Sequence, residues 1–388
     1  MSLIGLRWAV LGAAILPSLY YVVVIIAARS FFRRVNPGPR DFTPPVSVLK
    51  PVHGLEHEAY ENFASFCHQD YPQYEILFGV SDEQDAATPV IRRLIADFPG
   101  LPIRLMVTPE KIGANDKINK VCGLARAARH NLLVLSDADI RVGRGYLRSV
   151  ASPFHDSRVG AVTSLFSGIA VRSLWPELEA IYLSTDFMPS VLMARQLEGM
   201  RFAMGATVAV TRRNLAEIGG FEALTNEAAD DYELGCRIAA RGHRVELVDG
   251  TVKTWCTLSS LPEFFIQRLR WAIMARQARP LGYAGLVFTQ GLPWTILAAI
   301  LAPSHLGAWG FVAAYLILRM GVVFTMGVWG LHDDLLKRRW WLVPLWDAFA
   351  FVIWFISLFW NRVRWRGAEY RVAGGRLIPV SSNAPRQN

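Results

Sequence analysis

Two aspartates in the middle of the chain, Asp137 and Asp139, follow closely on a run of apolar residues, Leu132–Leu135. Residues two apart at the end of a strand point to the same side, so their carboxylates can act together. Such a pair suits Mg²⁺ or Mn²⁺, which commonly links one or two protein carboxylates to the phosphates of a substrate. The alternative is an acidic turn before a helix, because an isolated Asp-x-Asp pattern often arises by chance.

Further polar side chains are predicted at neighbouring strand ends. Lys50 ends the first apolar run of this region and Asp82 follows the second. The lysine can neutralise phosphate, and the aspartate can accept a hydrogen bond from a base N–H. The segment Lys111–Asn119 contains Gly113 and Lys117 before a predicted helix, which suits a diphosphate cradle. Alone, this segment would be an ordinary loop.

An acidic segment, Glu227–Glu233, opens a further predicted helix and contains Asp231. Acidic residues are common in the first turn of a helix because they interact favourably with its dipole. The functional alternative is that one carboxylate acts as a general base for an incoming hydroxyl group. Asp231 is our candidate for that base.

Three residues on a later predicted helix, Gln267, Arg270 and Trp271, are three and four positions apart and share one helical face. An arginine there can contact diphosphate oxygens. The alternative is an arginine at a membrane surface.

The region 41–260 has the pattern of an α/β domain. Short β-rich runs alternate with amphipathic stretches, which predicts a mainly parallel sheet with helices on it. The runs are Val46–Leu49, Glu75–Phe78 and Leu132–Leu135, and the predicted helices include Thr88–Phe98 and Asn119–His130. Sheets of this kind bind ligands beyond the carboxyl ends of their strands, where the candidate residues above are expected.

The flanking regions are predicted to lie in a membrane. Trp8–Ala28 carries no charged residue and is long enough to cross a bilayer as a helix. Arg29, Arg33 and Arg34 follow it and outnumber Arg7 before it, so the chain then enters the cytoplasm. We therefore expect a multi-pass inner-membrane protein whose α/β domain lies on the cytoplasmic face.

The chain becomes apolar again beyond the α/β domain. Residues 261–282 are typical of an amphipathic helix at a membrane surface. Three apolar stretches follow, Tyr283–Ala302, Leu306–Leu331 and Trp341–Trp360. Four spans in all would leave the basic tail outside, against the positive-inside bias, so one stretch is a candidate re-entrant segment. Trp341–Trp360, which contains Pro344 and Asp347, is the one we expect to be interrupted.

Arg319 lies within an apolar stretch and therefore needs a partner or a cavity, since a charge inside a bilayer costs about 2.5 to 3.5 kcal/mol on insertion scales. Asp347 is the expected partner. The predicted organisation has five parts: a transmembrane anchor and linker (1–40), the α/β domain (41–260), an interfacial helix (261–282), a transmembrane region (283–361) and a basic tail (362–388).

Composition agrees with a membrane protein. The 388 residues are 52% hydrophobic and 19% charged, against about 25% charged in ordinary soluble domains. The many aromatic residues exclude disorder. The net charge of +9 suits anionic partners, and because many basic residues flank apolar segments, a membrane surface explains it better than nucleic acid. The four cysteines are far apart and indicate neither a zinc site nor a disulfide framework.

Taken together and in this order, the residues resemble the ceramide glucosyltransferases, within the inverting glycosyltransferases of GT-A fold. The resemblance covers nearly the whole chain. It is carried by Lys50-Pro51-x-x-Gly54, Asp70-Tyr71-Pro72-x-Tyr74-Glu75, Lys111-x-Gly113-x-Asn115-x-Lys117-x-Asn119, Asp137, Asp231-Tyr232, Gln267-x-x-Arg270-Trp271 and Trp365-Arg366-x-x-x-Tyr370-Arg371.

The resemblance implies a UDP-sugar donor, a lipid acceptor and a divalent metal. Asp82 then binds the uracil–ribose end, and Asp137 and Asp139 hold the diphosphate and Mg²⁺ or Mn²⁺. Asp231 is the catalytic base. The remaining UDP-sugar contacts are Lys50, Lys117, Gln267, Arg270 and Trp271, of which the last three close over the leaving group and the acceptor.

The acceptor class stays open at this point. The chain is also similar to bacterial hopanoid glycosyltransferases, notably at Ala138–Val142 and Gly205–Thr207, and its complete Asp-x-Asp pair is nearer to the bacterial pattern. The sugar would be glucose or N-acetylglucosamine. Less favoured alternatives are a processive polysaccharide synthase, for which three C-terminal segments are too few, and a lipid flippase, which predicts more polar residues along the spans.

Overall fold

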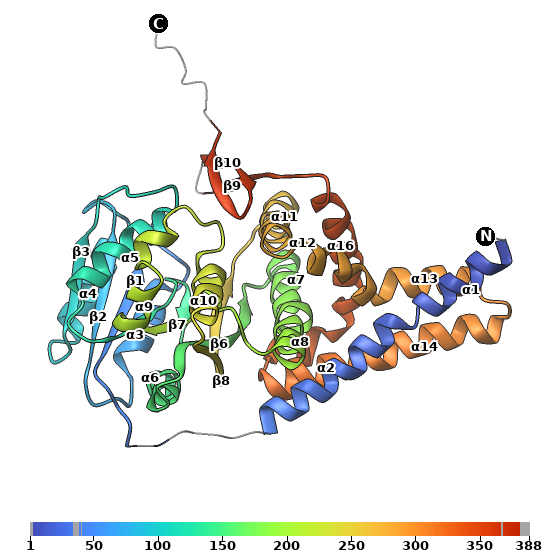
Figure 1. Cartoon of the computed structure of the whole chain (residues 1–388), viewed down its shortest axis with the longest axis horizontal. Helices are drawn as coiled ribbons and strands as arrows, with labels where there is room; N and C mark the ends of the chain where they lie inside the picture. The colour runs from blue at the N-terminus through green and yellow to red at the C-terminus, as the bar shows by residue number, and fades with distance from the viewer. Residues whose placement is uncertain (1–2, 34–38, 40, 366–367, 381–388) are drawn as a thin grey trace, which may run out of the picture. The chain divides into compact units, whose positions relative to one another are not determined.

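The computed structural model describes residues 3–33, 39, 41–365 and 368–380 (Figure 1). The chain divides into two compact units. We call Val35–Ile169 with Leu197–Trp255 the α/β unit, and Met1–Arg34 with Ala170–Gln196 and Cys256–Asn388 the helical unit.

The α/β unit is built on an eight-stranded sheet in the order β3-β2-β1-β4-β7-β6-β8-β5. The strands are β1 (Val46–Pro51), β2 (Tyr74–Val80), β3 (Ile103–Val107), β4 (Leu132–Leu135), β5 (Ile140–Arg141), β6 (Val159–Ala170), β7 (Val208–Thr211) and β8 (Arg244–Cys256). Pairs β1–β2, β2–β3 and β1–β4 are parallel, whereas β4–β7, β6–β7 and β5–β8 are antiparallel. The predicted α/β class with a parallel central sheet is confirmed, and antiparallel strands extend it into a mixed sheet.

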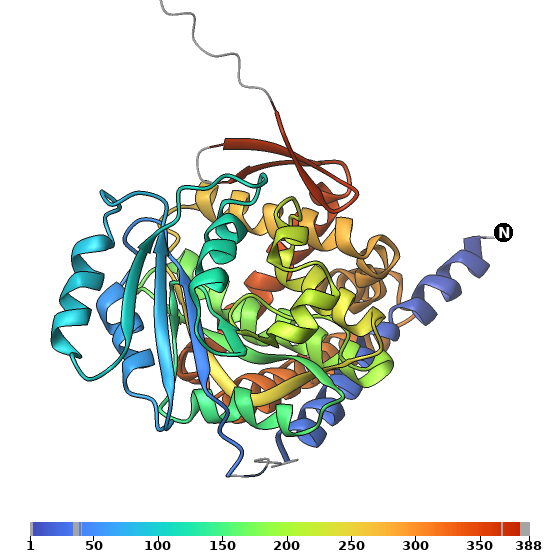
Figure 2. The same ribbon diagram turned by 60° about the vertical axis from the view of Figure 1, so that its left-hand side comes forward.

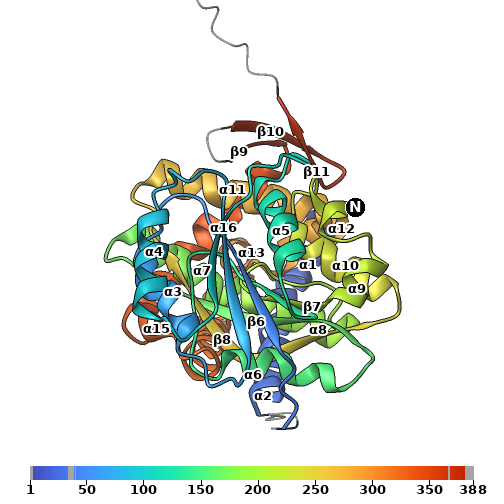
Figure 3. The same cartoon turned by 90° about the vertical axis from the view of Figure 1, so that its left-hand side faces the viewer.

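Helices cover both faces of this sheet (Figures 2 and 3). They are α3 (Ala59–Cys67), α4 (Thr88–Asp97), α5 (Asp116–Ala127), α6 (Tyr146–Ala151), η1 (Ser152–His155), α9 (Arg212–Glu217), η3 (Phe221–Leu224) and α10 (Asp230–Ala240). Because side chains alternate along a strand, Leu77 packs in one core with Ile118 of α5, while Phe78 meets Phe63 of α3 at 4.8 Å between ring centres. Because helices cover both faces of the sheet, side chains on both sides of these strands are buried. This explains why the strand sequences are almost continuously hydrophobic.

The order of the strands reverses at β1, which lies between β2 and β4. After β1, the chain forms β2 and then β3 on one side of β1. It then returns to form β4 on the other side of β1. Such a reversal leaves a crevice at the carboxyl ends of the two strands, where ligands bind in open α/β sheets. Lys50 and Asp137 stand at or just after these ends.

The helical unit contains most of the remaining elements. Its helices are α1 (Leu3–Ala13), α2 (Leu16–Arg33), α7 (Leu174–Tyr182), η2 (Leu183–Phe187), α8 (Met188–Glu198), α11 (Leu261–Ala278), α12 (Pro280–Gly285), η4 (Leu286–Thr289), α13 (Gly291–Leu301), α14 (His305–Val322), η5 (Val323–Gly330), α15 (Asp334–Arg339), η6 (Trp340–Leu342) and α16 (Val343–Ser357). A small antiparallel sheet, β9 (Arg362–Trp365), β10 (Ala368–Ala373) and β11 (Arg376–Pro379), follows them.

Within the described residues, three helices are long and apolar enough to cross a membrane: Ile4–Arg33, His305–Gly330 and Asp334–Ser357. A fourth candidate, Pro280–Thr289 with Gly291–Leu301, is bent by 50°. The interruption that we expected within Trp341–Trp360 therefore lies elsewhere. Pro344 falls in the first turn of α16, where a missing N–H breaks no helical hydrogen bond.

The second reason for expecting an interruption was the charge of Asp347, and this charge is paired with that of Arg319. The Arg319 and Asp347 side chains are both buried and approach to 2.6 Å, so the predicted ion pair between α14 and α16 is confirmed.

Candidate functional site

Lys50 links the ends of the two central strands. Its fully buried Nζ donates to the carbonyl oxygen of Asp137 at 2.5 Å and lies 3.5 Å from Ser136 Oγ. The same ammonium stands 4.0 Å from the centre of the Phe66 ring. Burial lowers the pKa of Lys50 to about 7, although the Asp139 and Asp137 carboxylates oppose the shift. Lys50 thus anchors the loop that carries the Asp-x-Asp pair.

The two carboxylates of that pair have different partners. Asp137 Oδ1 lies 2.9 Å from Lys117 Nζ, and the side chain is partly exposed. Asp139 Oδ2 accepts a hydrogen bond from Thr254 Oγ1 of β8 at 2.6 Å. Burial, together with the neighbouring Asp137 charge, raises the pKa of Asp139. A cation placed at this pair would relieve that repulsion.

Lys117 brings a second acidic segment to the same place. It lies in the first turn of α5, where the Asn115 side chain caps the helix by accepting from Ile118 N–H at 3.3 Å. Lys117 Nζ is 3.2 Å from Asp230 Oδ2, and Asn115 Nδ2 donates to Asp230 Oδ1 at 3.1 Å. Burial acts to lower the pKa of Lys117, but the surrounding carboxylates outweigh it and raise that pKa above its usual value. The lysine is therefore a permanent cation between two acidic segments.

Asp231 lies in the first turn of α10, and its Oδ1 accepts from Tyr232 N–H at 2.8 Å. Burial and the adjacent Asp230 carboxylate raise the pKa of Asp231 to about 6, while Lys117 acts in the opposite direction. A carboxylate with such a pKa is ionised at neutral pH and is a better proton acceptor than an ordinary aspartate.

These groups converge on Gly205. A Cβ atom at this glycine would lie 3.0 Å from Asp137 Oδ2, 3.2 Å from Asp231 Oδ2 and 3.3 Å from Lys117 Nζ. The missing side chain leaves a space that Asp137 of the Asp-x-Asp pair, Lys117 and the candidate base Asp231 all approach. Residues from three elements, distant in sequence, thus form one site.

Four backbone N–H groups of the predicted diphosphate cradle donate hydrogen bonds to other groups of the protein. Asn119 Oδ1 accepts from the N–H groups of Ile112 and Gly113, at 3.2 and 2.9 Å. The next two amides donate to Asn226 Oδ1 and to the Thr225 carbonyl oxygen. These four N–H groups are therefore not available to a diphosphate, and the predicted cradle would have to bind phosphate through side chains such as Lys117.

The other predicted residues belong to other elements of the chain. Asp82 follows β2, is exposed, and accepts from Gln84 N–H at 2.8 Å. Gln267, Arg270 and Trp271 all lie on α11 of the helical unit, where Arg270 Nη2 donates to Gln267 Oε1 at 3.1 Å.

Sequence reasoning missed three members of the site. Asp230 appeared in the acidic segment but was not selected, although its carboxylate is paired with Lys117, as that of Asp137 is. Thr254 is 115 residues from Asp139, and no local pattern connects them. Gly205 was noticed only as part of a family resemblance, and its role depends on three side chains brought to it by folding.

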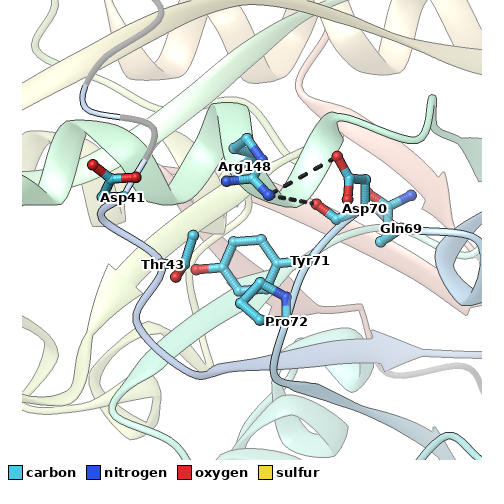
Figure 4. Close-up of a pocket in the computed structure, with 7 residues that line it drawn as sticks. All are labelled: Asp41, Thr43, Gln69, Asp70, Tyr71, Pro72 and Arg148. Atoms are coloured by element: carbon cyan, nitrogen blue, oxygen red, sulfur yellow. Dashed lines mark hydrogen bonds and ion pairs between the residues drawn. The ribbon is translucent and has the colours of Figure 1, made fainter.

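A surface hollow of about 500 Å³ lies elsewhere in the α/β unit (Figure 4). Its lining includes Asp41, Tyr71 and Arg148, and Arg148 Nη2 lies 3.3 Å from the Asp70 carbonyl oxygen. Asp41 precedes β1 and Tyr71 precedes β2, so the hollow is at the amino ends of these strands, at the sheet edge opposite the candidate site.

Sequence comparison finds relatives with a stated activity. The sequence model of the family described as "Glycosyl transferase family 21" matches residues 7–378. Ceramide glucosyltransferase 1 of Caenorhabditis elegans is 29% identical over 243 residues, covering 61% of this chain and 52% of that protein. Ceramide glucosyltransferase 3 of the same organism is 25% identical over 265 residues, covering 68% and 58%. The chain thus spans about half the length of the curated relatives it matches.

Structure comparison finds a mannosyltransferase of Pyrobaculum calidifontis, solved in complex with GDP-Man and Mn²⁺. It shares 18% sequence identity, with a TM-score of 0.53 over 92% of this chain and 99% of that one. At this identity the likeness shows the fold alone, and it confirms the predicted GT-A type of fold.

Proposed function

This chain belongs to glycosyl transferase family 21, and we propose on that basis that it transfers a hexose from a UDP-sugar to a hydroxyl group of a membrane lipid. The observation that carries the proposal is the meeting of Asp137, Asp231 and Lys117 around Gly205. It joins a proton acceptor, a carboxylate suited to a metal and a permanent cation within one small space. Those are the groups that a one-step displacement at a sugar diphosphate requires.

In the proposed reaction, Asp231 accepts the proton of the lipid hydroxyl as its oxygen bonds to C1 of the sugar. The bond between C1 and the diphosphate oxygen breaks, UDP leaves with the electron pair, and the configuration at C1 inverts. Lys117 stands where it can offset negative charge on the diphosphate. The raised pKa of Asp231, about 6, supports its role as the base.

A divalent cation fits the donor set of this site. Within the described part of the chain, no group of three or more His, Cys, Asp or Glu side chains could hold a metal ion, so protein groups alone do not complete a coordination shell. Two carboxylates, Asp137 and Asp139, with further oxygens from the diphosphate suit Mg²⁺ or Mn²⁺. Bound there, the ion would neutralise charge on the leaving group.

For the donor and acceptor we propose UDP-glucose and ceramide, since the relatives named above are ceramide glucosyltransferases. This assignment is favoured over the hopanoid alternative. Asp82, Gln267, Arg270 and Trp271 are proposed as further donor-binding residues on the family resemblance, and Lys50 as the anchor of the Asp-x-Asp loop. The apolar helices associate the protein with a membrane, which we propose is the cell inner membrane, with the α/β unit on its cytoplasmic face.

The experiment that tests this function is mass spectrometry of lipids from cells that express the chain and receive ceramide or bacteriohopanetetrol. The expected product is hexosylceramide, absent from cells expressing the Asp231→Asn variant. An N-acetylhexosaminyl hopanoid would instead establish the other acceptor, and no new lipid with either compound would contradict both assignments.

Filling the space at Gly205 should impair catalysis more than folding. In a Gly205→Ala variant the new Cβ would press on the ends of three flexible side chains, which can shift by a few tenths of an ångström. We expect kcat to fall by about 10- to 100-fold, because small displacements of reacting groups are costly, with little change in the unfolding temperature. The matched control is Gly100→Ala, where no atom lies within 4 Å of the new Cβ. Equal activities of the two variants would contradict this arrangement.

The pH profile of transfer should report the base. Asp231 must be ionised to accept a proton, and its pKa is raised to about 6. We therefore expect kcat/KM to fall roughly tenfold per pH unit below that value, whereas an ordinary aspartate would stay ionised down to about pH 4. Initial rates between pH 4.5 and 8 measure this. A rate that stays constant down to pH 5 would exclude Asp231 as the titrating base.

A further inference from the structure

A carboxylate in the helical unit has one oxygen fixed and the other presented outward. Asp186 lies on η2, a π-helical turn between α7 and α8. Its Oδ2 accepts from Trp346 Nε1 at 2.7 Å, Arg319 Nη2 at 2.8 Å and Thr185 Oγ1 at 2.9 Å. The side chain is still 35% exposed, and no described residue donates a hydrogen bond to Oδ1. Single π-helical turns are frequent at functional sites because they redirect side chains.

The Trp346 ring that donates to this carboxylate belongs to a cluster of aromatic rings. The Tyr182 ring lies 5.9 Å from Phe187 and 5.0 Å from Trp346, measured between ring centres. Phe187 in turn lies 5.6 Å from Trp271 of α11. Rings from three segments of the helical unit therefore form an apolar wall beside a rigid hydrogen-bond acceptor.

Arg268 adds hydrogen-bond donors to the same wall. Its guanidinium lies 4.7 Å from the Tyr182 ring centre and 4.8 Å from that of Trp271. Nη2 donates to Glu179 Oε1 at 2.7 Å, but Nε and Nη1 are buried and have no hydrogen-bond partner among the residues that the structure describes. The side chain is only 2% exposed. Buried donors in native proteins are normally satisfied, so two unused ones point to a ligand with an acceptor oxygen.

The charges select an uncharged polar ligand. Two arginine charges would repel an added cation. One is the guanidinium of Arg268, which lies against Tyr182 and Trp271, and the other is Arg319, which is already paired with Asp186. An added anion would meet the outward oxygen of Asp186. A neutral group that carries both O–H or N–H donors and a carbonyl acceptor satisfies both sides.

We propose that Asp186 and Arg268 bind the polar head of the acceptor lipid. Asp186 Oδ1 accepts a hydrogen bond from a hydroxyl or amide N–H of the lipid, and Arg268 donates to its amide carbonyl oxygen. This assignment rests on the proposed function and names the lipid subsite that it needs. The helical unit, which contains the candidate membrane spans, is where an amide-containing lipid would be met.

The test is equilibrium binding of a fluorescent short-chain ceramide to the full chain in detergent, without UDP-sugar. We expect Asp186→Asn to weaken binding by at least about tenfold, as for the loss of one hydrogen bond to a charged group. The matched control is Asp347→Asn, which removes the other carboxylate paired with Arg319 but presents none outward. Equal weakening by the two variants would show a structural effect and overturn the proposal.

A second probe separates direct contact from altered folding. In a ceramide methylated at the amide nitrogen and at both hydroxyls, the donors to Asp186 are gone, so wild type should bind it about tenfold less tightly and Asp186→Asn should not discriminate. Equal binding of both probes by wild type, or tighter binding of a long-chain ammonium lipid, would overturn the proposal. Ceramide binding that needs Asp186, without sugar transfer to ceramide, would contradict the proposed function alone. Transfer whose acceptor KM is unchanged in Asp186→Asn would contradict the lipid subsite alone.

Discussion

Replacing Asp231 with asparagine is expected to lower kcat for sugar transfer by at least about 100-fold while UDP still binds. Asparagine has nearly the same shape, so Tyr232 N–H keeps an oxygen to donate to. It cannot accept the proton of the attacking hydroxyl, however, and a positioned base typically contributes about 10² to 10⁴ in rate. The measurement is steady-state UDP release with UDP-glucose and ceramide, together with calorimetric titration of UDP.

The control for this variant lies in the same first turn of α10. Glu233→Gln also removes one acidic charge, but Glu233 is paired with Arg237 rather than placed at Gly205. It should retain nearly full turnover. Activity of Asp231→Asn within a few-fold of wild type would remove Asp231 from the mechanism and leave Asp230 as the next candidate base.

Removing Arg319 should have the largest effect on stability. In an Arg319→Leu variant, the buried Asp347 carboxylate loses its cation, and the Thr185 carbonyl oxygen loses its 2.7 Å donor. Breaking a buried ion pair by removing one partner costs about 3 to 5 kcal/mol. We expect a marked fall in the thermal unfolding midpoint in detergent and a low yield of folded protein.

Two further variants test whether the loss of stability comes from the lost ion pair. Arg319→Lys keeps the charge and should be less harmful, although it cannot reproduce the fork of donors to Asp347 and Asp186. The double variant Arg319→Leu with Asp347→Leu removes both members of one pair and should be more stable than Arg319→Leu alone. A single Arg319→Leu variant as stable as wild type would show that the network contributes nothing to stability.

The central half of the fold was predictable because its physics is local. The apolar run of β4 and the carboxylates just after it identify a strand end without help from the rest of the chain. The predicted helix at Asn119–His130 begins instead at Asp116, because the Asn115 side chain caps it three residues earlier. Capping residues such as this one could have been read from the sequence.

The site itself depends on contacts that the sequence does not display. The side chain of Asn119 was expected to help form a cradle, but it satisfies the amides of that loop instead. The pairing of Thr254 with Asp139 follows from the order of strands in the sheet. Likewise, the bend in the apolar region lies between η4 and α13, where the sequence pattern showed one continuous stretch.

The buried amine of Lys50 also provides a chemical probe for local opening of the sheet. With a pKa of about 7, a large fraction of this amine is uncharged at neutral pH and therefore nucleophilic, yet the side chain is fully buried. An acylating reagent can reach it only when the structure around it opens locally, so the rate of labelling measures how often this part of the sheet opens. Compounds that hold this part of the sheet closed would slow the labelling. The reactivity of one buried amine would then report how often the structure opens locally.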